Sequence, residues 1–205
     1  MNKLQGLLSL GLGLMMLCSG PLLAQQGDFW SRSAVEAGWG YQLPKAPTAG
    51  MEAKDYANFQ SFYVGGRFEL SDIWGLRGTY AYHAFEHQDD AELGLTIHKL
   101  TAEMTVLLMQ AIQQQSSEPF EIMAHAGLGL STGKSARQSS SDLMPNLQAG
   151  LMTIYQLGSQ WSMHLDATYV FNFSQDLDYS GAAALSKSTT GNYFAASLGI
   201  AYKLR

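Results

Sequence analysis

The sequence predicts an all-β protein, an eight-stranded antiparallel up-and-down transmembrane β-barrel. Three observations predict it. Segments of about ten residues alternate between apolar and polar side chains, which is the period of a strand with two unlike faces. About ten residues is also the length that a tilted strand needs to cross a bilayer. Eight such segments follow one another, and short turns alternate with longer polar loops between them, as in outer-membrane barrels.

The stretch 61–86 shows the alternation most clearly and predicts a hairpin. Its apolar face carries Phe62, Val64, Gly66, Phe68, Leu70, Trp74, Leu76, Gly78, Tyr80 and Tyr82. The opposite face carries Tyr63, Gly65, Arg67, Glu69, Arg77, Thr79, Ala81 and His83. A tight turn at 71–73 joins the two arms. One face of this hairpin is therefore apolar and the other is charged.

The same alternation predicts six further strands, over residues 33–42, 96–109, 120–130, 147–156, 161–173 and 193–204. The strand over 161–173 is the clearest of these, with Trp161, Met163 and Leu165 on its apolar face. The strand over 147–156 is the weakest, because Met152 and Ile154 lie on its polar face. Between them we expect turns at 110–118 and 158–160 and long outward-facing loops at 43–58, 87–94, 133–144 and 174–190.

The N-terminus predicts a signal peptide over residues 1–24, which leaves 25–205 as the barrel domain. A basic start at Lys3 precedes an apolar run, and Ala24 provides a small residue for cleavage. The full chain has 12 basic and 17 acidic residues, and Lys3 is the one basic residue in the removed segment. The mature chain therefore has 11 basic and 17 acidic residues, a formal net charge of −6. This acidic balance excludes nucleic acid as an expected partner. The mature chain also has no cysteine, since Cys18 lies in the removed segment.

Aromatic residues favour a membrane barrel over a soluble one. A lipocalin-like periplasmic binder or a β-sandwich would bury the apolar face and expose the charged one. Here the aromatic residues lie near both ends of the apolar face and predict two girdles around an aliphatic band: Trp39, Tyr41, Trp74, Tyr82, Tyr155, Trp161, Tyr169 and Phe171. Such girdles fit the two interfaces of a bilayer and have no obvious use in a buried core.

The polar faces of the strands then converge inside the barrel. We predict a lumen charge network of Glu36, Arg67, Glu69, Arg77, Lys99, Glu103, Glu121, His125, His164 and Asp166. Within it, Arg67, Arg77, Glu69 and Glu103 are expected to form the central pairs. Because an eight-stranded barrel has an interior just wide enough for side chains, no wide pore is expected.

Several segments resemble the transmembrane domain of OmpA-like outer-membrane proteins. They are residues 62–68 and 74–82 on either side of the first turn, then 124–129 and 196–202. The resemblance spans roughly residues 33–204 and implies an eight-stranded barrel with a structural or surface role. Two departures are expected to matter. The chain ends at Arg205 without the peptidoglycan-binding domain of many relatives, and it ends without the usual closing aromatic residue that aids recognition by the barrel assembly machinery.

Reactive residue types occur, but their spacing favours a structural role. Ser162, His164 and Asp166 share one strand face, yet residues two apart on a strand lie about 7 Å from each other, too far for a catalytic relay. A metal site from His125, His164, Glu121 and Asp166 would need close approach across the interior. We therefore predict no enzyme, no cofactor and no metal. The alternative that remains is a lipid-modifying barrel enzyme resembling a lipid A deacylase, with candidates at His83, His87 and serines 139–141.

The predicted function is that of a small integral outer-membrane barrel of a diderm bacterium, with a role in envelope integrity or surface interaction. Its expected partners are outer-membrane lipid and the barrel assembly machinery. The four outer loops, at 43–58, 87–94, 133–144 and 174–190, are expected to meet an unknown extracellular ligand, because surface loops carry most recognition functions.

Overall fold

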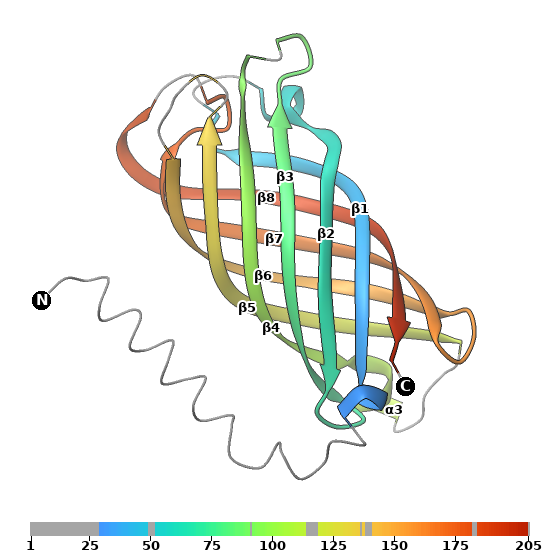
Figure 1. Cartoon of the computed structure of the whole chain (residues 1–205). Coiled ribbons are helices and arrows are strands. Elements are labelled where there is room, and N and C mark those ends of the chain that lie inside the picture. Colours follow the sequence, from blue (N-terminus) through green and yellow to red (C-terminus); the bar gives the residue numbers. More distant parts are fainter. Residues whose placement is uncertain are drawn as a thin grey trace, which may run out of the picture.

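The chain folds into a closed barrel of eight antiparallel strands (Figure 1). The computed structural model describes residues 29–48, 52–90, 92–113, 119–135, 137, 141–181 and 184–204. The predicted signal peptide lies outside these residues. The strands are β1 (Ser33–Ala46), β2 (Asn58–Glu69), β3 (Trp74–Glu86), β4 (Gly94–Leu107), β5 (Phe120–Ser135), β6 (Ser141–Gln156), β7 (Trp161–Leu177) and β8 (Ala184–Lys203).

Each strand pairs with the next one in the sequence, and β8 returns to pair with β1. The closing ladder runs from Ala34 opposite Lys203 to Ala46 opposite Asn192. Closure gives the backbone groups of the first and last strands a partner, which is the condition for a sheet to survive in lipid. The predicted fold class, strand number and up-and-down order are confirmed.

Three short helical segments accompany the strands in the described part of the chain. They are η2 (Trp30–Arg32) before β1, η3 (Ala53–Tyr56) between β1 and β2, and α3 (Leu108–Gln113) between β4 and β5. In Figure 1, α3 lies at the barrel end where β1 begins and β8 ends. The strand predicted to end at residue 109 therefore ends two residues earlier, because the chain turns into α3. Among the described residues, no helix combines the length and the apolar character needed to cross a membrane.

The two faces of the wall have the polarity expected of a barrel in lipid. Outward-facing Leu100, Leu128 and Leu165 are 64%, 66% and 60% exposed, whereas inward-facing Arg77 and Glu103 are 4% and 2% exposed. A soluble protein buries the first kind of residue and exposes the second. The lipocalin-like alternative is therefore wrong, and the lipid-facing band of a membrane barrel is observed instead.

The predicted girdle residues lie on the outer surface in two sets. Trp74, Tyr155 and Trp161 lie near the end that carries α3, and Trp161 packs against Tyr202 with ring centroids 4.8 Å apart. The other set, Trp39, Tyr41, Tyr82, Tyr169 and Phe171, lies toward the opposite end. Phe59 and Phe62 join this second set through ring contacts with Trp39 and Tyr82.

The predicted outer loops are shorter than expected, because the strands continue into them. The clearest case is the predicted loop 133–144, where β5 and β6 remain paired as far as Lys134 opposite Ser141. Likewise β1 extends to Ala46, β4 begins at Gly94, β7 extends to Leu177 and β8 begins at Ala184. Beyond the bilayer an outward side chain faces water rather than lipid, so the apolar alternation ends there. The backbone ladder continues past that point. The segments between strands are therefore 47–57, 87–93, 136–140 and 178–183.

Candidate functional site

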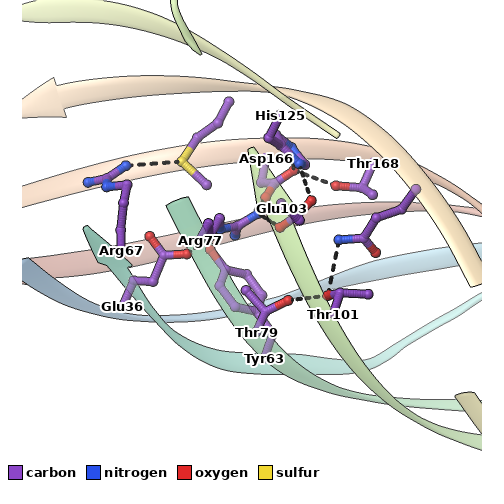
Figure 2. Close-up of polar contacts among 12 residues, drawn as sticks. Glu36, Tyr63, Arg67, Arg77, Thr79, Thr101, Glu103, His125, Asp166 and Thr168 are labelled. Atoms are coloured by element: carbon purple, nitrogen blue, oxygen red, sulfur yellow. Dashed lines mark hydrogen bonds and ion pairs between the residues drawn. The ribbon is translucent and has the colours of Figure 1, made fainter. Parts of the chain in front are cut away.

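An ionic layer crosses the lumen near its middle (Figure 2). Arg77 on β3 donates to Glu36 on β1 at 2.5 Å and to Glu103 on β4 at 3.1 Å, and its Nη2 lies 3.0 Å from Asp166 on β7. Each of these side chains is at most 5% exposed. One guanidinium thus holds carboxylates from three strands, including one on the far wall.

His125 on β5 completes this layer on the side away from Glu36. Its Nδ1 lies 2.6 Å from Glu103 and its Nε2 lies 3.2 Å from Asp166. The ring fits because position 150 on β6 is glycine, where a Cβ would lie 2.5 Å from His125 Nε2. We name Glu36, Arg77, Glu103, His125 and Asp166 the ionic layer.

A hydrogen-bonded layer follows toward the outer end. Thr79 and Thr101 share a hydrogen bond of 2.6 Å, and Gln148 donates to Thr101 at 3.3 Å. Lys99 donates to Gln148 and lies over the Tyr193 ring at 5.8 Å. This buried ammonium is therefore held by an amide and an aromatic face.

An apolar cluster fills the outer end of the lumen, where the alternation predicts polar residues. Its inward-facing members are Phe85, Leu95, Ile97, Val170, Leu177 and Tyr193, and the loops add Tyr56 and Tyr179. We name these eight residues the outer plug. Tyr179 is fully buried, and burial raises the pKa of its hydroxyl well above the ordinary value, so the side chain is neutral. Leu95 and Ile97 lie four and two residues before Lys99 and so share its inward strand face. This spacing is the sequence signal that could have revealed the plug.

A cavity of about 710 Å³ occupies the opposite end of the barrel, which the pattern of short turns and long loops predicts to face the periplasm and which we name the periplasmic end. Arg67 lies at its inner end, and Met123, Ile154 and Leu107 form an apolar wall. Its rim carries Glu69, Asp72, Gln110, Glu121, Gln156 and Lys203. The lumen is therefore closed at its outer end and open at its periplasmic end.

The structure brings five of the ten predicted network residues together, and they are the members of the ionic layer. The other five lie apart from it: Arg67, Glu69, Lys99, Glu121 and His164. Of the predicted central pairs, Arg77 with Glu103 forms, but Arg67 and Glu69 do not join it. Glu69 pairs with Lys203 at 3.1 Å at the periplasmic rim. Arg67, directly opposite Arg77 in the β2–β3 ladder, lies instead beside two methionine sulfurs.

The remaining two predicted residues have local partners. His164 contacts the Tyr63 hydroxyl, and Glu121 accepts hydrogen bonds from the backbone N–H groups of Met109 and Ile122. Among the described residues, no hydrogen bond joins His164 to Ser162 or to Asp166. Nor does that part of the chain contain a group of three or more His, Cys, Asp or Glu side chains placed to hold a metal.

Of the described candidates for a lipid-modifying site, His83 does not lie on the outer rim. His83 points into the lumen, where its Nδ1 lies 2.8 Å from Ser61 Oγ and 3.0 Å from Gln42 Oε1. His87 lies in the loop before β4 and packs against Tyr56. Ser141 is exposed at the start of β6, and serines 139 and 140 lie outside the described residues.

A family model matches residues 47–205, and its description is "Putative MetA-pathway of phenol degradation". This match includes seven of the eight strands and every side chain of the ionic layer except Glu36. The chain belongs to this family. No curated protein sequence matches the chain.

Solved outer-membrane barrels share the fold. Neisserial surface protein A is 14% identical, the match covers 85% of this chain and 98% of that protein, and the TM-score is 0.56. The attachment invasion locus protein Ail of Yersinia pestis is 18% identical, with 83% and 96% covered and a TM-score of 0.47. OprG of Pseudomonas aeruginosa is 12% identical, the match covers 85% of this chain and 97% of that protein, and the TM-score is 0.47. The protein is an eight-stranded outer-membrane barrel of a diderm bacterium, and its resemblance to OmpA-like barrels is confirmed at the level of fold.

Proposed function

We propose that the protein is a non-conducting outer-membrane barrel that supports envelope integrity or surface interaction. The observation that carries this proposal is the blocked lumen. The Arg77 side chain spans from β3 to Asp166 on β7, with a closest N–O distance of 3.0 Å. An ion crossing the barrel would have to break this contact and then pass the outer plug. Both steps oppose conduction, because a buried charge left without its partner is strongly destabilised.

Contacts between the outer loops support a role at the cell surface. Tyr179 N–H donates to the Pro47 carbonyl at 2.9 Å, and Gln88 N–H donates to the Asp55 carbonyl at 2.9 Å. Ser135 Oγ donates to the Gly181 carbonyl at 2.7 Å. These bonds tie the first, second and fourth loops to each other or to the wall. A preformed surface of this kind loses less entropy on binding a partner than separate mobile loops would.

Conductance in planar lipid bilayers tests the blocked lumen. The purified barrel is compared with a general porin inserted under the same conditions, at 1 M KCl. We expect no stepwise conductance from the wild-type barrel. Steady ohmic steps from the wild-type protein would contradict the proposal and would make diffusion the better assignment.

The family's description favours a second function, a contribution to the use of phenol by the cell. We propose that such a contribution is made by binding rather than by catalysis, since the reactive candidates lie apart from one another. We expect a deletion strain to grow more slowly on phenol than the complemented strain. The two strains should grow equally on succinate. Equal growth on both carbon sources would contradict this second proposal.

Lipid and the barrel assembly machinery remain proposed partners. The exposed apolar band and the two girdles support contact with lipid, and the closed strand order supports assisted insertion. Depletion of the assembly machinery should reduce the fraction of the protein that changes gel mobility on boiling. An unchanged fraction would contradict a dependence on that machinery.

A further inference from the structure

We propose that the periplasmic cavity is a binding site for a small amphipathic carboxylate, in which Arg67 pairs with the carboxylate and the apolar wall holds the body. This site goes beyond the proposed function, because it opens to the periplasm and needs neither conduction nor the outer loops. The cavity volume of about 710 Å³ lies within the range of known small-molecule sites.

Arg67 differs from the other basic residues that point into the lumen. Arg77 has three carboxylate partners, Lys203 has Glu69, and Lys99 has the Gln148 amide oxygen. Among the described residues, the hydrogen-bond contacts of Arg67 are to sulfur, with its Nη1 3.5 Å from Met123 Sδ and 4.0 Å from Met152 Sδ. In Figure 2 the guanidinium lies to one side of the ionic layer, and a dashed line joins it to a sulfur atom. Among the described residues, no carboxylate lies within ion-pair distance of it.

The acidic residues around the cavity are already occupied or lie at its rim. Glu69 receives both of its hydrogen bonds from Lys203 Nζ, each at 3.1 Å. Glu121 accepts from two backbone N–H groups, and Asp72 lies in the exposed turn between β2 and β3. The inner end of the cavity therefore presents a cation whose hydrogen-bond donors face only weak acceptors.

The chemistry of the wall selects the rest of the ligand. A planar guanidinium pairs with a carboxylate through two parallel hydrogen bonds, which a single ammonium cannot match. Met123, Met152 and Ile154 are each at most 3% exposed and line or adjoin the inner end of the cavity. Methionine sulfur makes favourable contacts with aromatic rings. A carboxylate on a compact aromatic or aliphatic body therefore fits better than a free inorganic anion.

Glu36 is the competing partner for Arg67. Its Oε1 accepts from Arg77, while its Oε2 has no hydrogen-bond partner among the described residues. If Arg67 turned inward to Glu36, the cavity would hold no available cation. Loss of Arg67 would then weaken the fold and would leave ligand binding unchanged, which separates this arrangement from the proposed site.

Fluorine NMR of the folded barrel in lipid nanodiscs tests the site. The probe is 4-fluorobenzoate, and its neutral analogue 4-fluorobenzamide is the matched control. We expect the benzoate signal to broaden in a saturable way and the benzamide signal to respond at least tenfold more weakly. Equal responses would overturn the proposal, because partition into lipid or a purely apolar pocket would then explain them.

Variants locate the carboxylate. Arg67→Gln should weaken benzoate binding at least tenfold, whereas Lys203→Gln at the rim should change it less than twofold. Both variants are first checked for the folded gel mobility without boiling. If Arg67→Gln does not fold, Gln156→Trp, which narrows the mouth and leaves Arg67 in place, should reduce binding to a similar degree. Full binding in Gln156→Trp, or in folded Arg67→Gln, would overturn the proposal.

Discussion

The middle and the periplasmic end of the lumen are built from the same strands but differ in how their charges are met. In the ionic layer, one guanidinium and one imidazole face three carboxylates at distances of 2.5–3.2 Å. At the periplasmic end, Arg67 has sulfur neighbours and a cavity beside it. Arg67 and Arg77 are direct cross-strand neighbours on β2 and β3.

This difference teaches that strand alternation assigns a residue to a face and does not assign it a partner. The two arginines have the same face, neighbouring positions and the same chemistry. Only Arg77 lies at the level where Glu36, Glu103 and Asp166 converge. The middle of the lumen should therefore contribute to stability, and the periplasmic end should be free to bind. The following predictions test this contrast, from the largest expected effect to the smallest.

Arg77→Ala should lower the free energy of unfolding by about 3–5 kcal/mol, because it leaves buried carboxylates without a partner. Urea unfolding in lipid vesicles, followed by tryptophan fluorescence, measures the change. Lys203→Ala is the control, since its ion pair with Glu69 is close to half exposed and should contribute at most about 1 kcal/mol. Equal losses in the two variants would contradict the special role of the ionic layer.

Tyr179→Ala should lower the free energy of unfolding by about 3 kcal/mol, because it opens a void in the outer plug. The same variant should make the loop between β7 and β8 easier to cleave with protease added to whole cells. Tyr155→Ala, on the lipid-facing surface, removes an equal side chain without creating an internal void. A plug variant as resistant to urea and protease as this control would show that the plug is not a packed core.

Thr79→Val should lower the free energy of unfolding by about 1 kcal/mol, because it removes the hydrogen bond to Thr101 and keeps the side-chain volume. The matched control is Thr132→Val on the exposed face of β5. Both are measured by urea unfolding. If the two variants are equally stable, the hydrogen-bonded layer contributes no net stability.

Arg67→Gln should change the free energy of unfolding by less than about 1 kcal/mol, since no carboxylate of the described residues pairs with this guanidinium. The comparison with Arg77→Gln is the sharpest available, because the two positions face each other across β2 and β3. A loss as large as that of Arg77→Gln would indicate that Arg67 pairs with Glu36. The middle and the periplasmic end of the lumen would then both contribute to stability.

The sequence by itself determined the barrel, because alternation and girdles depend on which medium each face meets. The outward positions within the predicted strands could be assigned in this way, since lipid favours apolar side chains on the outer face of each strand. It also determined that Arg77 and Glu103 lie in the lumen. The ends of the strands were not visible, since outside the bilayer both faces meet water.

Only the tertiary structure decided which lumen residues meet. Glu36 and Asp166 reach Arg77 from strands distant in the sequence, at a height set by the stagger of the closed barrel, and His125 joins them through Asp166 and Glu103. Arg67 and Glu69 lie outside this layer, and the loops place Tyr56 and Tyr179 in the outer plug. Partners across a lumen depend on closure and register, which are properties of all eight strands together, and no single strand's pattern contains them.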